Sequence, residues 1–256
     1  MLYPSLAVNV DIVTPMSDTT VLLLHGLGGN AAVWDGVRGA LGDVPVVAPD
    51  LPGHADGPRL ARYDIGLMAA SLAAQLDPTL RYAVLGHSLG GAVGLALSSG
   101  WFGLQISAVV GLGIKVAWTE AEKAGAAALG AKPVAWFEGR EAAVDRFVKV
   151  AGLVGLVDAD AEVVRRGVMV GLDGRWRTTV EPGTVAAGAP DMAGLLGASR
   201  AQVRLARGDL DPMVTTADLE ALGAAPVVLP GLGHNAHVED PSAVAALVRR
   251  ELLQAG

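Results

Sequence analysis

The chain contains no cysteine, and this absence excludes disulfide bonds, thiolate nucleophiles and zinc sites built on cysteine. Aromatic residues are scarce, at 4% of the sequence, and charged residues make up only 18%. Long hydrophobic runs are also missing. The longest, such as residues 21–24, have the length of a strand and are too short to cross a bilayer. We therefore do not expect a membrane protein.

Positive charge is in short supply as well. The sequence has 19 Lys and Arg against 26 Asp and Glu, a net charge of −7, and no cluster of basic residues. This balance argues against nucleic acid as a partner and against binding at a membrane surface. No basic segment followed by a long apolar core opens the sequence, so we expect no signal peptide and a cytoplasmic location. The expected partner is a small-molecule substrate, and the sequence leaves the oligomeric state open.

What the sequence does have is enough apolar material for one sizeable core, with 52% hydrophobic residues in a chain of 256. Short β-branched runs alternate with longer helical segments. The strand candidates are residues 7–13, 20–24, 44–48, 82–85, 108–112, 203–206 and 225–229. The helix candidates between and after them are residues 65–76, 89–98, 217–222 and 242–253. This alternation predicts an α/β fold with a mostly parallel central sheet flanked by helices.

The alternation breaks between residues 115 and 199, where we find helical patches at 120–129, 140–150 and 159–170 but no clear strand signal. Because the strand–helix pattern resumes afterwards, we interpret this stretch as a helical lid. It is inserted before the strand expected at residues 203–206, which is the strand that the candidate acids follow. The predicted organisation is therefore a core of residues 1–114 and 200–256, with residues 115–199 as a lid that is not an independent domain.

The strongest chemical signal is the sequence G-H-S-L-G at residues 86–90. It follows the expected strand 82–85 and opens the expected helix 89–98. A sharp strand-to-helix turn holds its serine in a strained position and lifts the hydroxyl towards a helix N-terminus, where negative charge is favoured. The pentapeptide alone could be a simple turn. In this setting it predicts that Ser88 is a nucleophile.

A serine hydroxyl needs a base, and five histidines are available. His234 lies in a loop after the last expected strand and before the last expected helix. It also follows the serine and the candidate acids, in the chain order Ser…Asp…His of one large hydrolase fold class. We predict His234 as the base, with His237 as the alternative, against the simpler interpretation of His234 as an ordinary loop residue.

The base must be oriented by a third group. Residues 207–212, R-G-D-L-D-P, follow the strand 203–206 and offer two carboxylates. We prefer Asp211, with Asp209 as the alternative, although an aspartate before proline is also typical of turns. Residues 113–116, at the end of another expected strand, carry no carboxylate.

Glycine-rich residues 25–29, H-G-L-G-G, follow the first buried strand and can point backbone N–H groups inward. We predict the amides of Leu27 and Leu89 as the oxyanion hole. His25 is expected to brace this turn by hydrogen bonding, not to act in catalysis. Asp50 and His54 form a two-residue pair without a third metal ligand, so a structural turn is expected there. No metal and no cofactor are predicted.

With these pieces in place, the sequence resembles the α/β-hydrolase family over about residues 21–252, most weakly at 115–199, which corresponds to the family's variable lid. The matching motifs are the oxyanion turn at 25–29, the D-x-P-G-H turn at 50–54, the nucleophile elbow at Ser88, the G-x-x-D-x-x-V acid motif at 208–214 and the G-H-x-x-x-x-E-x-P histidine loop at 233–241. The resemblance implies a serine hydrolase that needs no cofactor.

The sequence departs from the family pattern at three positions. Ala55 and Asp56 stand where a small Gly and Ser are often found, so we expect that loop to differ in shape. Carbon–carbon bond hydrolases of the family often carry Trp directly after the catalytic histidine, where this chain has Asn235. Ser88 argues against the haloalkane dehalogenases and epoxide hydrolases, whose nucleophile is an aspartate.

Substrate signals are weaker. Four aromatic residues of the expected lid either pack it onto the core or line a substrate pocket: Trp118, Trp136, Phe137 and Trp176. Three arginines there, Arg140, Arg175 and Arg177, either bind an anionic group or are solvated and paired. An aromatic lining predicts an apolar pocket of small to medium size.

The leading hypothesis is therefore a serine hydrolase that cleaves a small to medium, largely apolar carboxylic ester or lactone through an acyl-enzyme. Two alternatives stay open at this point. One is a carbon–carbon bond hydrolase or an enzyme like the menaquinone-pathway synthase, which has a similar motif pattern. The other is a non-catalytic ligand-binding member of the fold, as some hormone receptors are.

Overall fold

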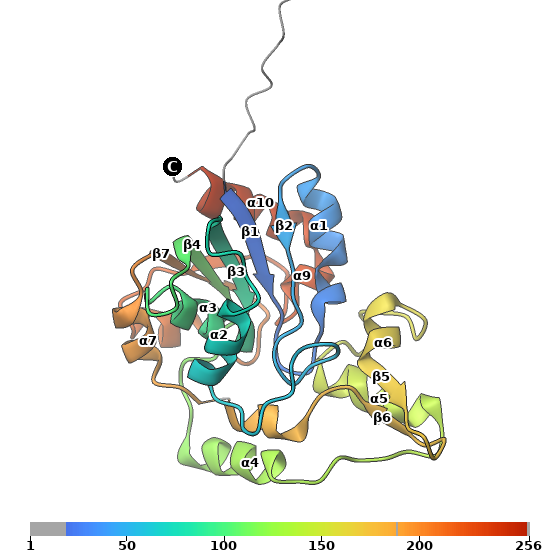
Figure 1. The fold of residues 1–256 in the computed structure, drawn as a ribbon. Helices are drawn as coiled ribbons and strands as arrows, with labels where there is room; N and C mark the ends of the chain where they lie inside the picture. The colour runs from blue at the N-terminus through green and yellow to red at the C-terminus, as the bar shows by residue number, and fades with distance from the viewer. Residues whose placement is uncertain (1–18, 188, 255–256) are drawn as a thin grey trace, which may run out of the picture.

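The computed structural model describes residues 19–187 and 189–254, and the strand expected at residues 7–13 lies outside them. A six-stranded sheet with the order β2-β1-β3-β4-β7-β8 forms the centre of the molecule (Figure 1). Every neighbouring pair in it is parallel. Its strands are β1 (Thr19–Leu24), β2 (Val46–Val47), β3 (Arg81–His87), β4 (Gln105–Leu112), β7 (Gln202–Gly208) and β8 (Val227–Leu229). The predicted α/β class with a mostly parallel sheet is confirmed.

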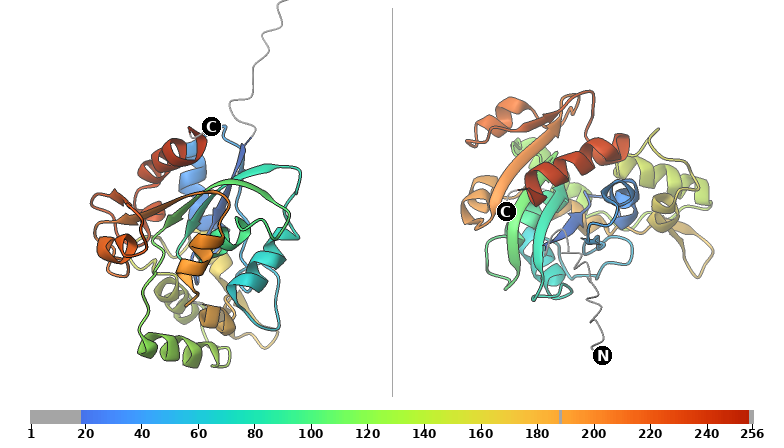
Figure 2. Two further views of the ribbon diagram at one scale, coloured as in Figure 1. Left: turned by 90° about the vertical axis from the view of Figure 1, so that its left-hand side faces the viewer. Right: turned by 90° about the horizontal axis from the view of Figure 1, so that it is seen from above.

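Helices cover both faces of this sheet, as Figure 2 shows from two further directions. The alternation of side chains along β1 sorts them into two cores. Leu23 packs into one core with Val37 and Val244, whereas Leu22 packs into the other with Met68 and Val93. The first face carries α1 (Asp35–Leu41) and α10 (Pro241–Val248), and the second carries α2 (Ile65–Ala73), α3 (Leu89–Leu97), α7 (Met192–Ala198) and α8 (Thr216–Glu220).

Some helices differ from expectation. The last predicted helix, residues 242–253, is α10 followed by a π-helical turn at Arg249–Leu253. A short 3₁₀ turn, η1 (Ala31–Trp34), leads into α1, and neither it nor α1 was predicted. Two glycines in the seven residues of α1 weaken its helical signal, because glycine is a poor helix former. Burial of Val37 and Leu41 in the core compensates for that weakness.

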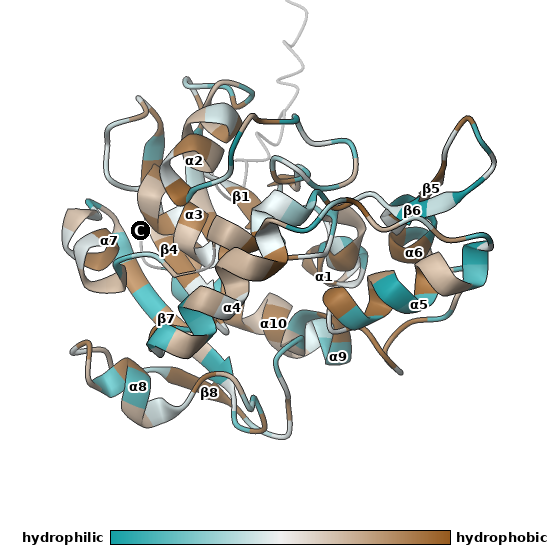
Figure 3. Cartoon of the chain, turned by 90° about the horizontal axis from the view of Figure 1, so that it is seen from below, coloured by the Kyte–Doolittle hydropathy of each residue, from teal (hydrophilic) through white to brown (hydrophobic). Residues whose placement is uncertain are grey.

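The segment of residues 115–199 lies between β4 and β7 in sequence, and we call it the inserted segment. Its helices α4, α5 and α6 lie below the carboxyl ends of the strands in Figure 1, whereas its last helix, α7, packs on the second face of the sheet. It contains α4 (Glu120–Gly130), α5 (Arg140–Val150), α6 (Glu162–Gly167), β5 (Val168–Val170), β6 (Trp176–Thr178), the 3₁₀ turn η2 (Pro182–Ala187) and α7. Seen from below, α4 crosses in front of the sheet (Figure 3). No described helix is both long and apolar enough to span a membrane.

The helix predicted over residues 159–170 is wrong at its carboxyl end. Helix α6 stops at Gly167, and β5 pairs antiparallel with β6 as a hairpin. The reason is local, because β-branched Val168 and Val170 favour an extended chain and residues 171–174, G-L-D-G, turn it back. Gly174 has φ +81°, a left-handed conformation that suits glycine.

Candidate active site

Ser88 occupies a strained turn between β3 and α3. Its φ is +49°, and Ala55 is the one other non-glycine in the described residues with a positive φ. Such backbone conformations cost of order 1–3 kcal/mol and persist where the surroundings impose them. The surroundings here are backbone, since a Cβ on Gly90 would lie 2.3 Å from the carbonyl oxygen of Leu24, and one on Gly86 would lie 2.4 Å from that of Gly90. The G-x-S-x-G spacing is thus imposed by the close approach of α3 to β1 and β3.

His234 lies in the loop after β8 and contacts the carboxylate of Asp211. His234 Nδ1 is 2.9 Å from Asp211 Oδ2, and the side chain of Asp211 is fully buried. A carboxylate accepts hydrogen bonds, so Nδ1 carries the proton and donates it. The second oxygen of Asp211, Oδ1, accepts from the backbone N–H of Met213 at 2.8 Å. The pair therefore fixes the imidazole in the tautomer whose Nε2 is basic.

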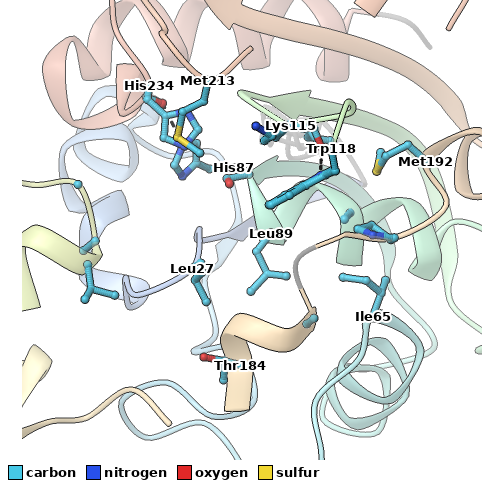
Figure 4. A pocket seen from close by; sticks show the side chains of 18 of the residues that line it. Leu27, Ile65, His87, Leu89, Lys115, Trp118, Thr184, Met192, Met213 and His234 are labelled. Atoms are coloured by element: carbon cyan, nitrogen blue, oxygen red, sulfur yellow. Dashed lines mark hydrogen bonds between the residues drawn. The ribbon is translucent and has the colours of Figure 1, made fainter. Parts of the chain in front are cut away.

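Ser88 and His234 face the same cavity of about 260 Å³, which we call the inner cavity. Leu27 and Leu89 line it as well, so four of the predicted site residues meet at one cavity, and Figure 4 shows His234, Leu27 and Leu89 around it. Asp211 does not line this cavity and reaches it through its contact with His234 Nδ1. In the described structure no hydrogen bond joins the Ser88 hydroxyl to the imidazole. Catalytic contacts of this kind are often long without substrate and tighten in the complex.

Two backbone amides are available at the inner cavity. Leu89 is the first residue of α3, so its N–H has no carbonyl four residues earlier in the helix to bind. Leu27 lies in the turn after β1, and its N–H has no acceptor among the described residues. Both amides lie at places where negative charge is favoured, Leu89 because the helix dipole adds to its free N–H.

His25 and His54 brace the oxyanion turn, and each accepts a backbone N–H from the other's loop. His25 Nε2 accepts from Leu51 at 2.9 Å, and His54 Nε2 accepts from Gly28 at 3.2 Å. Both rings are therefore neutral, with Nδ1 donating to the carbonyls of Gly26 and Pro52. Burial lowers the pKa of His25 to about 4 and that of His54 to about 3. Both histidines therefore hold the two loops together through hydrogen bonds.

Asp50 is also engaged in structure. Its carboxylate accepts from the N–H of Ala31 at 2.7 Å and forms an ion pair with Arg166 at 2.6 Å. Arg166 belongs to α6, so this pair joins the inserted segment to the loop that follows β2. Arg166 also contacts Asp56 at 2.9 Å. Ala55, directly after His54 in this loop, has a φ of +39°. Whether the loop differs in shape from the family pattern stays a prediction.

A buried guanidinium holds the acid loop in place. Arg207, at the end of β7, is 8% exposed, and within the described residues its side chain makes no ion pair. It donates instead to the carbonyls of Val214, Asp209 and Asp211, at 2.6, 3.2 and 3.3 Å. The sequence reasoning missed this role; the signal that could have found it is a lone arginine directly before the G-x-x-D motif.

The two alternatives for base and acid lie outside the inner cavity. His237 is packed between Trp34 and His87, with ring centroids 4.5 and 4.4 Å away. Burial lowers its pKa to about 3, and its Nδ1 has no hydrogen-bond partner in the described structure. Asp209 accepts from the N–H of Gly231 at 2.7 Å and fixes the loop after β8.

His87 forms a wedge between the base and the oxyanion turn. Its Nε2 donates to the backbone carbonyl of His234 at 2.9 Å, and the centroids of the two rings are 4.7 Å apart, with their planes tilted by 58°. Burial lowers its pKa well below the ordinary value, so the ring is neutral. The neighbouring Gly26 leaves room for this ring, because a Cβ there would lie 2.6 Å from His87 Nδ1.

The lining of the inner cavity is mostly apolar, and only part of it was predicted. Trp118 lines it, as expected. Trp136, Phe137 and Trp176, the other possible pocket residues, do not line it: Phe137 and Trp176 pair through their backbones, while Trp136 packs beneath Arg175 and Arg177. Apolar residues that the sequence reasoning missed are Ile65, Ala92, Ile114, Val150, Ala187, Met192 and Met213.

The three arginines considered for anion binding are engaged within the inserted segment. Arg140 donates to the carbonyl of Ala159 at 3.1 Å. Arg175 pairs with Asp173 and Arg177 with Glu181, each at 2.7 Å. None of the three lines the inner cavity.

A model of the alpha/beta hydrolase family matches residues 21–247 of this sequence. The chain belongs to the alpha/beta hydrolase family. The family match covers the sheet, the Ser88 turn, the acid loop and the histidine loop, and it also spans the inserted segment.

Curated alpha/beta hydrolase relatives match over shorter stretches. A segment of 90 residues is 36% identical to the lipase LipV of Mycobacterium tuberculosis, covering 33% of each chain. A segment of 80 residues is 42% identical to a pimeloyl-[acyl-carrier protein] methyl ester esterase of Neisseria meningitidis, covering 31% of this chain and 30% of that one. These matches thus span about a third of the relatives' length.

Two solved structures resemble most of the chain. An esterase of Mycobacterium tuberculosis, Rv0045c, is 26% identical with a TM-score of 0.70, over 90% of this chain and 83% of that one. The second, an E-2-(acetamidomethylene)succinate hydrolase, is 23% identical with a TM-score of 0.71, over 91% of both chains. The latter likeness concerns the fold alone.

Substitution of Gly90 by Ala tests the steric origin of the Ser88 turn. We expect a loss of about 2–3 kcal/mol in the free energy of unfolding, because the new methyl group meets backbone that cannot move aside. The matched control is Gly39→Ala in α1, where a Cβ meets no atom within 4 Å. That variant should gain about 0.5–1 kcal/mol, since alanine favours helix. Chemical denaturation measures both, and equal effects would contradict the steric explanation.

The four neutral histidines, His25, His54, His87 and His237, make stability depend on pH. Their pKa values are lowered in the folded state, so the unfolded chain binds more protons below about pH 6.5. Their contribution to the free energy of unfolding is fully present above that pH and is lost as the pH falls towards 3–4. For His25, His54 and His237 the expected loss in the free energy of unfolding is about 2 kcal/mol each between pH 7 and pH 5. Urea denaturation as a function of pH measures this slope.

His237→Leu isolates one of these contributions, because this side chain has no hydrogen bond to lose in the described structure. The slope of stability against pH should fall by up to one proton, about 1.4 kcal/mol per pH unit. An unchanged slope would show that folding does not lower the pKa of His237.

Proposed function

We propose that this chain is a serine hydrolase that cleaves a small to medium, largely apolar carboxylic ester or lactone through an acyl-enzyme. The observation that carries the proposal is the buried Asp211–His234 pair at the cavity that also holds the strained Ser88 turn. A histidine fixed by a buried carboxylate, next to a serine raised at a helix N-terminus, suits acyl transfer.

In the proposed reaction the Ser88 oxygen attacks the substrate carbonyl carbon while His234 Nε2 takes the hydroxyl proton. The negative charge that develops on the carbonyl oxygen is stabilised by the amides of Leu27 and Leu89. His234 then gives its proton to the departing alcohol, and the acyl group stays on Ser88. Water, deprotonated by His234, attacks this ester and releases the acid.

The choice of an ester as substrate is supported by the lining of the inner cavity and by the relatives. Its walls are mainly aliphatic side chains and the ring of Trp118, which favour an apolar acyl or alcohol group. Proteins named lipase and esterase are among the sequences and structures that this chain resembles.

As part of this function we infer that residues 115–199 form a lid over a core of residues 1–114 and 200–256. In support, the inserted segment supplies part of the wall of the inner cavity, including Trp118, Val150 and Thr184. The cavity lies between this segment and the carboxyl ends of the strands, the usual ligand position in open α/β sheets.

Ser88→Ala should abolish ester turnover and labelling by a fluorophosphonate, since both require the hydroxyl, while circular dichroism stays unchanged. Short-chain p-nitrophenyl esters, assayed beside a dienoate ring-cleavage product, measure the activity and its class. Retention of wild-type esterase activity would refute the mechanism. Turnover of the dienoate alone would instead favour a carbon–carbon bond hydrolase, and no labelling of the unmodified chain would favour a passive binding protein.

Asp211→Asn should lower kcat by about a thousandfold or more, because an amide that donates to Nδ1 favours the wrong imidazole tautomer. Asp209→Asn is the matched control. The Asp209 side chain binds the N–H of Gly231 and not the imidazole, so most activity should remain. Steady-state kinetics on the same ester compares the two, and the opposite order would move the acid to residue 209.

A further inference from the structure

A second hollow adjoins the inner cavity on the side away from the base. This outer groove, of about 400 Å³, lies between α4, η2 and the start of α2. Ile65, Ala187 and Pro190 line both hollows, so the two share a boundary. Figure 4 shows Ile65 across the inner cavity from His234. A ligand that enters at the base and extends towards Ile65 therefore approaches the outer groove.

The charged side chains that line the outer groove are already engaged. Asp64 caps α2 by accepting the N–H of Leu67 at 2.8 Å, and Arg62 lies 3.6 Å from it. Lys123 forms an ion pair with Glu120 at 2.8 Å. Neither group is left over to recognise a charged ligand, so charge complementarity does not select an anion or a cation here.

The remaining walls are small and apolar. Ala126 and Ala127 face the groove from α4, and Ala186 and Ala187 face it from η2. Methyl groups offer no hydrogen bonds, so these walls suit a hydrocarbon chain better than a polar group. No residue of α4 is buried, so its inner face is available to such a chain.

We propose that the outer groove is a second subsite, which binds the distal part of a straight alkyl chain whose ester carbonyl lies at Ser88. This inference rests on the proposed esterase function and extends its substrates from small to medium esters to esters with one longer straight alkyl chain. The inner cavity takes the first carbons of the chain, and the boundary at Ile65, Ala187 and Pro190 is where the chain passes into the groove. The same chemistry can come from the acid or the alcohol side of the ester.

The burial of methylene groups lets us state how much kcat/KM should change with chain length. Each methylene removed from water contributes about fourfold in binding, and hence in kcat/KM where the contact persists in the transition state. The unmodified enzyme should therefore gain in kcat/KM as the chain lengthens beyond the inner cavity. A groove that is blocked loses that gain and leaves short esters unaffected.

Ala127→Phe fills the groove from an exposed position on α4, and Ala128→Phe is the matched control, because Ala128 is exposed on the same helix but does not line the groove. Two series of substrates are assayed: p-nitrophenyl acetate, butyrate, octanoate and dodecanoate, which lengthen the acid, and methyl, butyl, octyl and dodecyl acetate, which lengthen the alcohol.

We expect Ala127→Phe to lower kcat/KM for the longest chains of one series by about ten- to a hundredfold. Its kcat/KM for p-nitrophenyl acetate should equal that of the unmodified enzyme, and Ala128→Phe should match the unmodified enzyme on every substrate. The affected series identifies the acid or the alcohol side. Unchanged profiles in both series, or an equal loss at every chain length, would overturn the subsite. Failure of the proposed function would give a different result from failure of the subsite. In that case the unmodified enzyme would show no ester hydrolysis that Ser88→Ala abolishes.

Discussion

The hydrogen bond between Asp211 and His234 is the contact on which the rest of the site depends. A carboxylate that is fully buried is costly unless its oxygens are bound, and here one binds the imidazole and the other a backbone N–H. Arg207 secures the loop that carries it by donating to three backbone carbonyls. The acid loop is therefore built before any substrate arrives, and the imidazole it holds has one defined tautomer.

Environment, more than sequence, separates the five histidines. Four are buried and neutral, and they serve as hydrogen-bonding or packing elements around the turn, the base loop and α1. His234 differs in that a carboxylate binds its Nδ1 and the ring faces the inner cavity. Burial lowers the pKa of the other four imidazoles, so they take a proton less readily than a free histidine. The contact of His234 with a buried carboxylate and its place at the inner cavity support its proposed role as general base.

The core and the convergence of the site residues were predictable because they follow from local rules. A strand, a glycine-flanked serine and a helix require a sharp turn wherever they occur, and parallel strands bring their carboxyl ends to one edge. Ser88, Asp211 and His234 each follow the carboxyl end of a strand of this sheet, so three segments that are distant in the sequence meet at that edge. The predicted Leu27 and Leu89 amides lie at the same cavity for the same reason.

The rest could not be read from periodicity, because it depends on packing between segments. Nothing local distinguishes Trp118, which lines the inner cavity, from Trp136, which packs under two arginines. The β5–β6 hairpin was hidden because its strands have three residues each, too few for an alternating pattern. Helix α1 depends on burial more than on propensity.

Two helices of the inserted segment, α6 and α4, are attached to the core in different ways. Near α6, Arg166 pairs with Asp50, and Asn30 donates to the carbonyl of Val163 at 2.8 Å. Both contacts reach the loops next to the oxyanion turn. Helix α4 has no buried residue; its capping residue Glu122 pairs with Lys115, at the end nearest the core. Polar contacts thus tie α6 to the loops of Asp50 and Asn30, whereas the Lys115–Glu122 pair ties the start of α4 to a residue that lines the inner cavity. The face of α4 that lines the outer groove carries small side chains and no buried residue. Helix α4 is therefore attached to the core by a polar pair near its start and offers small apolar side chains along the groove, where a hydrocarbon chain would need only apolar area.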